Sequence, residues 1–416
     1  MHESVADPQT SPGAGREPGE SAVIVADDLS GALDTAAQWA RLGVQVTVRR
    51  AASAGDRAPV CALNTRSRER SPAQAYRRVR AVFERLGARV VYKKIDSTFR
   101  GPVAAELRAA LDSGAADRLL VAPAFPDQGR WVLEGRLVVR GARRSASPLD
   151  LLSLLRTDLG EPVELLDHAQ VTDGVAATAR RLNQTGARVI LADADSNDDL
   201  ETVAQSLWLS GGRVLPVGSA GLARPVAALW AGRGAQVVPP IELPQNGEPA
   251  LLLLGTYHET TVAQLRQLGA WNGVEVLSAQ TRRLSSEEGF LSEQRRLSER
   301  AAEAMAAGRS VALATGLVGF VRGCSLRPVR LLGAVNLSLL AHQRVRLLMI
   351  SGGDTCYEVL RQMRATHLQV VGEAQPGIPW SRVGDGPHAG LALITKSGGF
   401  GDPAALVRLL GGRDAG

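Results

Sequence analysis

Short apolar runs alternate with segments of helical periodicity along almost the whole chain. Strands are expected at 22–26, 44–49, 59–63, 89–94, 118–122, 187–192 and 213–218, and helices at 30–42, 72–86, 102–112, 173–183, 198–209 and 220–231. The alternation resumes with strands at 250–255, 310–314, 346–350 and 391–394, and helices at 259–268, 284–307, 326–341, 353–363 and 402–410. Strands that alternate with helices predict parallel βαβ units with buried strands. The predicted fold class is therefore α/β.

A proline-rich break divides this alternation into two halves. Residues 237–249 read VVPPIELPQNGEP, with four prolines and no periodicity. A chain of 416 residues is also too long for one ordinary core. We predict two three-layer α/β domains with mostly parallel sheets, at 21–237 and 250–416, and a linker at 238–249. Residues 1–20, rich in Pro, Gly, Ser and Glu, are expected to form a disordered tail.

The composition disfavours several classes of protein. Aromatic residues make up only 4% of the chain, which argues against a stacking platform for single-stranded nucleic acid. The arginine-rich run 66–89 could form a nucleic-acid surface, but without a binding motif it is interpreted as a solvated helix face. No apolar run approaches the roughly 18 residues of a membrane span. Three widely spaced cysteines and the absence of a signal peptide fit a reduced, cytoplasmic protein.

Two adjacent acids follow the first expected strand. Residues 26–34 read ADDLSGALD, so that Asp27 and Asp28 lie between a buried strand and a helix. Ligands of open α/β sheets bind beyond the carboxyl ends of the strands. A carboxylate here could orient or deprotonate a substrate hydroxyl, or hold a metal ion. Alternatively, Asp28 or Ser30 caps the helix, although one cap explains only one acid of the pair.

A second polar cluster follows the strand at 89–94. Residues 92–101 read YKKIDSTFRG and contain two of the three lysines among 48 basic residues. Lys94 offers a compact charge, whereas Arg100 offers a two-pronged fork that suits a carboxylate. The loop suits an acidic, hydroxylated ligand, and the alternative is a polar loop with a helix cap. The proline-bearing loop 122–130 ends in Arg130, which could reach an anion.

Three glycine-containing turns in the second half each follow an expected strand and enter a helix. They lie at 255–261, 352–355 and 396–401, and the last contains Lys396, the third lysine. Helix-start amides, close backbone approach at glycine and a lysine charge are features that hold phosphate groups. G-x-x-x-x-G-K-[ST] occurs nowhere in the chain, and G-x-G-x-x-G fails after Ala26, which disfavours a dinucleotide fold of the standard type. The six histidines show no metal-ligand spacing, and no G-x-S-x-G elbow occurs, so we predict neither a dedicated metal site nor a hydrolase triad.

Taken in order, these motifs resemble the four-carbon acid sugar kinase family. The resemblance extends over about residues 22–411 and rests on segments 26–34, 92–101, 122–130, 218–222, 255–260, 352–355 and 396–401. It implies an ATP-dependent kinase that phosphorylates the 4-hydroxyl of threonate, erythronate or 3-oxo-tetronate. The N-terminal domain would bind the sugar acid and the C-terminal domain ATP with Mg²⁺, with the active site in the interdomain cleft. A homodimer is a possible assembly; nucleic-acid and membrane partners are not expected.

The resemblance also implies roles for individual residues. The candidate catalytic acids are Asp27, Asp28 and Asp96, with Asp28 favoured as the base. The candidate substrate-binding residues are Lys94, Ser97, Arg100 and Arg130. The candidate ATP-binding residues are Thr256, Gly352, Gly353, Asp354, Thr355, Lys396, Gly399 and Gly401.

Several positions depart from the family pattern. Ser30 and Thr256 exchange one hydroxyl side chain for another, whereas Leu33 and Gly399 stand where Asn is common and His258 replaces a usual serine. Two other functions use the same loops: a different nucleotide-dependent enzyme, such as a ligase or a dehydrogenase, and a non-catalytic sugar-acid sensor. A sensor needs only one polar cluster, so the clusters in both domains disfavour it.

Overall fold

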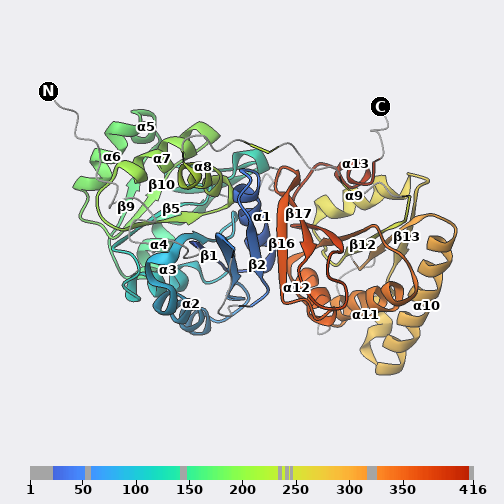
Figure 1. The fold of residues 1–416 in the computed structure, drawn as a ribbon. Helices are drawn as coiled ribbons and strands as arrows, with labels where there is room; N and C mark the ends of the chain where they lie inside the picture. Colours follow the sequence, from blue (N-terminus) through green and yellow to red (C-terminus); the bar gives the residue numbers. More distant parts are fainter. Residues whose placement is uncertain are drawn as a thin grey trace. The chain divides into compact units, whose positions relative to one another are not determined.

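The structure, a computed structural model, describes residues 22–51, 58–140, 148–232, 237–238, 243, 247–315 and 326–411. The chain divides into two compact units, Met1–Val238 and Pro239–Gly416, here called the N-terminal and C-terminal domains. Both are α/β with mostly parallel sheets, which confirms the predicted fold class (Figure 1). The predicted tail 1–20 and most of the predicted linker 238–249 lie outside the described residues.

Parallel strands form the main sheet of the N-terminal domain, in the order β2-β3-β1-β4-β11-β5-β10-β9. Their bounds are β1 Ala22–Ala26, β2 Val46–Arg49, β3 Val60–Asn64, β4 Val90–Lys94, β5 Arg118–Ala122, β9 Val163–Leu166, β10 Val189–Ala192 and β11 Val214–Gly218. Every residue of β1, β3 and β4 is buried. Burial on both faces explains why β1 is a continuous apolar run rather than an alternating one, whereas β4 ends in two buried lysines.

Helices cover this sheet in two groups. One group contains α1 Leu29–Ala40, α6 Val175–Gln184, α7 Asn197–Leu209 and α8 Ala220–Ala231, and the other contains α2 Pro72–Leu86, α3 Val103–Asp112 and α4 Leu151–Leu159. Figure 1 shows α6, α7 and α8 above the sheet and α2 and α3 below it. The buried residues of α2 recur at helical spacing, namely Ala75, Val79, Val82 and Phe83, so that one stripe faces the core.

Short elements that the sequence did not predict complete this domain. An antiparallel sheet is formed by β6 Arg130–Leu133, β7 Arg136–Val139 and β8 Leu149–Asp150, and a short helix, α5, spans His168–Thr172. The predicted binding loop 122–130 therefore leads from the main sheet into this small sheet. Paired backbone bonds between Phe125 and Arg130, at 2.9 and 3.1 Å, close the turn.

The C-terminal domain has a mixed sheet in the order β13-β14-β12-β15-β18-β17-β16. Its strands are β12 Ala250–Leu254, β13 Val274–Ser278, β14 Ser310–Ala314, β15 Leu347–Ser351, β16 His367–Gln375, β17 Ile378–Val383 and β18 Ala392–Lys396. The first five in this order are parallel, whereas β17 runs antiparallel to β18 and β16. The hairpin β16–β17 and strand β13 were not predicted.

Helices also cover this sheet in two groups: α10 Glu287–Ala306, α11 Arg327–His342 and α12 Gly353–Gln362 pack in series, and α9 Glu259–Gly269 packs on α13 Ala405–Leu409. Leu252, Leu254, Met349 and Ile394 form the centre of a core between the sheet and α9 and α13. The helix predicted at 402–410 is shorter than expected, because Asp402 caps the turn before it through the amide of Ala404 at 2.8 Å. Within the described residues, the structure has no helix of the length and apolarity that a membrane crossing requires.

Candidate active site

The carboxyl ends of β3, β1 and β4 lie side by side in the N-terminal sheet. The register aligns Ala26, the last residue of β1, with Asn64 of β3 on one side and with Lys94 of β4 on the other. The chain therefore leaves the three strands at one level, as expected for ligand-binding segments of a parallel sheet. The predicted motifs 26–34 and 92–101 begin there.

Arg68, which follows β3, lies among three of the predicted acids. Its Nε and Nη2 lie 2.7 and 2.9 Å from the two carboxylate oxygens of Asp27. Its Nη1 lies 2.8 Å from Oδ2 of Asp28 and 3.5 Å from Oδ1 of Asp96. Burial raises the pKa of Asp27, but Arg68 and the two lysines of β4 more than offset this effect, so the pKa lies below its ordinary value.

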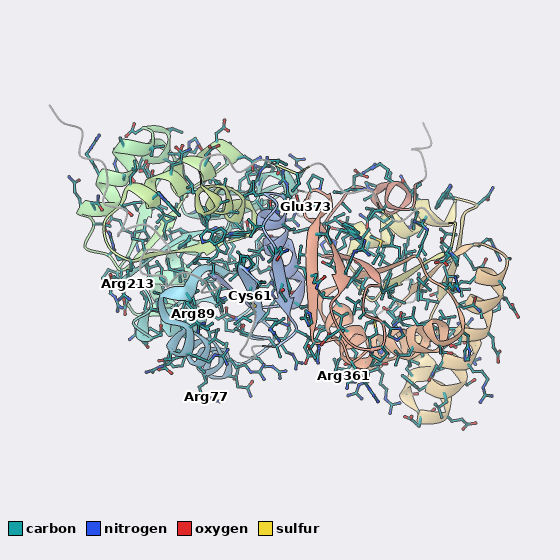
Figure 2. All side chains as sticks on the ribbon, in the orientation of Figure 1. Cys61, Arg77, Arg89, Arg213, Arg361 and Glu373 are labelled. Atoms are coloured by element: carbon teal, nitrogen blue, oxygen red, sulfur yellow. The ribbon has the colours of Figure 1, made fainter. Side chains whose placement is uncertain are left out.

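The interpretation of residues 66–89 as one solvated helix face is wrong at Arg68. This residue precedes α2, and its side chain is only 10% exposed. The interpretation holds for Arg77 and Arg78 of α2, which are exposed; Figure 2 shows Arg77 at the rim of the domain. The position of Arg68 just after a buried strand is the sequence signal that could have identified it.

Asp28 caps α1 and also belongs to the charged cluster around Arg68. Its Oδ1 accepts a hydrogen bond from the amide of Gly31 at 2.6 Å, which makes Asp28 the N-cap of α1. Its Oδ2 accepts a hydrogen bond from Ser30 Oγ at 2.6 Å and meets Arg68. The Asp28 side chain is 17% exposed, compared with 2% for Asp27 and 8% for Asp96. Of the three acids, Asp28 is therefore the most accessible.

Asp96 organises the turn after β4. Its carboxylate accepts hydrogen bonds from Thr98 Oγ1 at 2.5 Å and from both Nε and Nη2 of Arg100 at 2.8 Å. Burial raises the pKa of Asp96, but the hydrogen bond from Arg100 and the charge of Arg68 hold it well below its ordinary range. We expected the Arg100 fork to hold a ligand carboxylate, but it binds Asp96 instead. The Arg100 side chain is nevertheless 61% exposed. Ser97 is buried in the same turn.

The two lysines of β4 point to opposite faces of the sheet, as alternation along a strand requires. Lys93 is fully buried and lies 2.5 Å from Glu106 of α3. Lys94 donates to the carbonyl of Ile95 at 2.9 Å and lies 3.8 Å from Asp34 of α1. Lys94 therefore meets Asp34 on the α1 side of the sheet, and Lys93 forms a buried ion pair on the α3 side.

Asp34 belongs to the same region but was not among the predicted site residues. Its side chain is buried, and burial raises its pKa to about 7 from an ordinary value of 3.8. Lys94 opposes this shift, and the Asp28 carboxylate adds to it. Asp34, with its raised pKa, thus lies in the same region as Asp27 and Asp96, whose pKa values are lowered.

Gly31 lies where these charged groups converge. A Cβ at this position would lie 2.6 Å from Asp28 Oδ1, 3.0 Å from Lys94 Nζ and 3.5 Å from Arg68 Nη2. Asp28 and Lys94 therefore approach Gly31 more closely than any side chain at this position allows. Arg130 approaches from β6: burial lowers its pKa and the Asp96 carboxylate opposes that shift, which indicates that the two groups interact.

Three predicted glycine turns also meet in the C-terminal domain. The register aligns Leu254 of β12 with Ser351 of β15, and Ser351 with Lys396 of β18. The amide of Gly352 donates to the carbonyl of Lys396 at 2.9 Å. A Cβ at Gly398 would lie 2.5 Å from Thr256 Oγ1, so the turns after β12 and β18 approach more closely than any side chain at 398 allows.

Lys396 points into the turn that follows it. Its ammonium donates to Thr261 Oγ1 at 3.2 Å and to the carbonyls of Ser397, Gly398 and Phe400 at 2.9, 3.4 and 3.1 Å. Burial lowers the pKa of Lys396 to about 7. Its four recorded oxygen partners are neutral and belong to the protein, so its ammonium holds the glycine turn together from inside.

The start of α12 presents free backbone amides. Gly352 precedes it with φ +104°, a conformation that favours glycine. Among the described side chains, none caps this helix start, so the amides of Gly353, Asp354 and Thr355 lack helical partners. Such a helix start suits an anion.

His258, which replaces a serine usual in the family, caps the start of α9. Nδ1 of His258 accepts a hydrogen bond from the amide of Thr260 at 3.2 Å, which is the role of a capping serine. Thr256 Oγ1 accepts from the amide of His258 at 3.2 Å. Gly401, with φ +78°, turns the chain toward α13, and Gly399 lies in the turn just before it.

One group of possible metal ligands occurs among the described residues, outside the predicted site. His168, Asp195 and Asp199 offer ligand atoms within 4.8 Å of one another. However, Oδ2 of Asp199 accepts hydrogen bonds from the amides of Asp195 and Ser196, at 3.0 and 3.1 Å, as part of the α7 capping box. Capping of the helix start accounts for the position of this carboxylate.

Comparison with known proteins agrees with this division of the chain. A family model described as a sugar-binding N-terminal domain matches residues 22–226, and one described as a nucleotide-binding C-terminal domain matches residues 251–406. Together they match most of the chain. The chain belongs to the family that combines these two domains, that of the four-carbon acid sugar kinases.

Curated relatives cover nearly the full length. The chain is 33% identical to a D-threonate kinase of Bordetella bronchiseptica, over 92% of this chain and 95% of that protein. It is 28% identical to a D-erythronate kinase of Heliobacterium modesticaldum (92% and 94%) and 29% identical to a 3-oxo-tetronate kinase of Methylobacterium radiotolerans (93% and 97%). A crystal structure from Salmonella typhimurium LT2 shares the fold, with a TM-score of 0.73, 21% identity and coverage of 93% and 98%.

Proposed function

We propose that the chain transfers the γ-phosphoryl group of ATP to the 4-hydroxyl of threonate, erythronate or 3-oxo-tetronate. Family membership makes it a sugar-acid kinase; the proposal adds the donor, the reacting hydroxyl and the set of substrates. The observation that carries it is the presence of two clusters, each at the carboxyl ends of parallel strands and each in a differently matched domain. One cluster is rich in carboxylates and cations, and the other in glycines and helix-start amides.

The N-terminal cluster suits the sugar acid. A substrate carboxylate would bind Lys94 or Arg130, since the Arg100 fork is already occupied by Asp96. We propose Asp28 as the acceptor of the hydroxyl proton, because it is the most accessible of the three candidate acids. The absence of a side chain at Gly31 lets Asp28 and Lys94 come close together, where they would meet the substrate hydroxyl, with Ser97 contributing the polar wall of the Asp96 turn.

The C-terminal cluster suits the triphosphate. The amides at the start of α12, from Gly353 to Thr355, would bind phosphate oxygens, and Thr256 would approach them from the neighbouring turn. Lys396 would act by holding the turn that contains Gly399 and Gly401 rather than by direct contact. Phosphoryl transfer depends on positioning and on neutralised charge, which these groups supply without covalent chemistry.

Mg²⁺ would accompany ATP in this proposal. The exposed Asp354 carboxylate at the start of α12 is an oxygen ligand of the kind that Mg²⁺ prefers, so the residues fit this ion. When bound, the ion would neutralise charge on the phosphates. Positioning of the phosphates would still rest on the amides of the turns described above.

The test is a screen of stereoisomeric threonates, erythronates and 3-oxo-tetronates with ATP, in which ADP formation is coupled to an optical signal. We expect ADP only in the presence of one of these acids, and phosphate on the 4-oxygen of the product by NMR. Formation of AMP would indicate a ligase, and reduction of a nicotinamide cofactor a dehydrogenase. Binding of a tetronate without ADP formation would indicate a sensor.

A further inference from the structure

Arg68 contacts acids from two different strand ends. Its Nε and Nη2 pair with both oxygens of Asp27, and its Nη1 lies within 2.8 Å of Asp28 and 3.5 Å of Asp96. Asp27 and Asp28 follow β1, Asp96 follows β4, and Arg68 follows β3. A single side chain from a third strand end thus fixes the relative positions of the three candidate catalytic acids.

The backbone around Arg68 is itself tied to the same place. The amides of Ser67 and Arg68 donate to the carbonyl of Asp27, at 3.0 and 3.3 Å, and the amide of Thr65 donates to Ala26 at 2.9 Å. Gly101, with φ +91°, packs on the backbone of Arg68: a Cβ there would lie 3.0 Å from the Arg68 carbonyl oxygen. Three segments of the chain therefore hold Arg68 from both its backbone and its side chain.

The cluster needs the geometry of arginine. A guanidinium presents five donors in one plane, so it can chelate Asp27 and still direct Nη1 at two further carboxylates. A lysine offers the charge but not the fork. Without this cation, three close carboxylates would repel one another, and at least one of them would take up a proton near neutral pH.

Other charged groups face the cluster from the elements around it. Lys93 and Lys94 approach from β4 and lower the pKa of Asp27, Asp34 faces it from α1, and Glu106 faces it from α3. Arg100 adds a second guanidinium at Asp96. Of these cations, Arg68 is the one with ion pairs to all three acids in the described part of the chain.

We propose that Arg68 is the positioning residue of the sugar-acid site: it satisfies Asp27 and Asp96 and orients Asp28 so that this one carboxylate serves the reacting hydroxyl. The role of Asp28 toward a reacting hydroxyl rests on the proposed kinase function. The arrangement of the three acids around Arg68 does not depend on that function.

The activity test compares Arg68→Met and Arg68→Lys with Arg80→Met as the matched control. Arg80 lies on the surface of α2 and pairs with Glu84. The pH profile of kcat/KM for the sugar acid is measured at saturating ATP. In Arg68→Met we expect the acid limb to move up by about one pH unit or more, because a nearby cation lowers carboxylate pKa values by one to three units. We also expect kcat to fall by about 100-fold. Arg80→Met should keep the acid limb and the kcat of the wild type.

Arg68→Lys separates charge from geometry. We expect its acid limb to stay near that of the wild type, since the charge is retained, while kcat falls by about 100-fold because the fork is lost. This variant decides the matter if Arg68→Met does not fold. A wild-type kcat in Arg68→Lys, or an unmoved acid limb in Arg68→Met, would overturn the proposal.

A second measurement does not depend on activity. Melting temperatures of the wild type and Arg68→Met are compared from pH 4 to pH 8. The acids of the wild type stay ionised over this range, whereas in Arg68→Met at least one of them is protonated in the folded state near neutral pH. The folded variant then binds more protons than its unfolded chain and loses stability as the pH rises from 4, so the difference in melting temperature should widen as the pH rises. A difference that is the same at every pH would show that Arg68 acts by packing alone. If the wild type phosphorylates no tetronate, the proposed function fails, and the melting comparison still decides the role of Arg68.

Discussion

At the scale of single residues, an absent side chain at Gly31 is as important as the charges around it. We predict that Gly31→Ala folds, because alanine favours helix, but loses sugar-acid turnover. The added methyl carbon would lie 2.6 Å from Asp28 Oδ1 and 3.0 Å from Lys94 Nζ. We expect kcat/KM for the sugar acid to fall at least about 100-fold, measured by the coupled ADP assay.

The control for this substitution is Gly269→Ala at the end of α9, where a Cβ would meet only Val276 Cγ2, at 3.9 Å. That variant should keep wild-type kinetics. Near-wild-type turnover in Gly31→Ala, with an unchanged KM, would contradict the idea that the close approach of Asp28 and Lys94 to this residue matters for the reaction.

A pH-dependent stability is predicted for Asp34. Burial raises its pKa to about 7, above the ordinary value of 3.8, so the folded state binds this proton more tightly than the unfolded state. The resulting stabilisation is fully present below about pH 4 and is lost as the pH rises through about 7, with an upper limit of about 4 kcal/mol. Asp34→Asn lacks this proton and should gain stability relative to the wild type between pH 4 and pH 8.

Melting temperatures at intervals across this range check the prediction. Asp173→Asn removes a carboxyl that is 53% exposed and serves as the control with a flat difference. If the difference between Asp34→Asn and the wild type is flat as well, the Asp34 carboxyl is ionised throughout, and its pairing with Lys94 dominates over burial.

The residue scale also shows what the sequence could and could not reveal. Asp27, Asp28 and Asp96 were predictable because each lies directly beyond the end of a predicted strand, and both strands are buried throughout. Arg68 also follows a buried strand, but it was grouped with the surface arginines of α2, such as Arg77, and its contact with Asp27 spans 41 positions. Long-range ion pairs leave no periodic signal in one sequence. The sequence also does not show that the Lys396 side chain points into its own turn.

At the scale of elements, predictions succeeded where apolar periodicity was long. The helices at 72–86 and 220–231 have the predicted bounds. The strands of the small antiparallel sheet are two to four residues long, too short to show a period. The hairpin β16–β17 was missed because β16 is half-exposed and shows no continuous apolar run. Its turn, Pro376-Gly377, is the sequence feature that indicates a hairpin here.

The turn after β18 provides the prediction at this scale. The Lys396 ammonium binds three carbonyls and one hydroxyl from within the turn. Arginine carries the charge in a planar group that does not fit this compact arrangement, and methionine fills the space without donors. We expect both Lys396→Arg and Lys396→Met to raise the KM for ATP by at least about tenfold, which corresponds to about 1.4 kcal/mol, and to leave the KM for the sugar acid unchanged.

Steady-state kinetics with each substrate varied in turn provide the measurement. Thr256→Ser, which keeps a hydroxyl beside Gly398, is the conservative control in the same group of turns. Wild-type ATP kinetics in Lys396→Met would show that the turn holds its shape without the ammonium.

At the scale of the whole molecule, the two domains repeat one design principle with different chemistry. In each, buried parallel strands end at one level, and the segments that follow them bring distant residues together. This arrangement could be predicted, since alternating strands and helices imply parallel sheets and parallel sheets gather their strand ends. Beyond these strand ends, the N-terminal domain carries paired charges, and the C-terminal domain carries glycines and backbone amides.

The last prediction follows from this separation of chemistry. The recorded partners of Gly31 and of Lys396 all belong to their own domains. Each substitution should therefore weaken one ligand only. In calorimetry with a single ligand present, Gly31→Ala should lose sugar-acid affinity by at least about tenfold and keep the wild-type affinity for ATP, and Lys396→Met should show the reverse. A double variant should show the two losses together and no more. Loss of both affinities in either single variant, with folding intact, would mean that the two domains do not divide the substrates in this way.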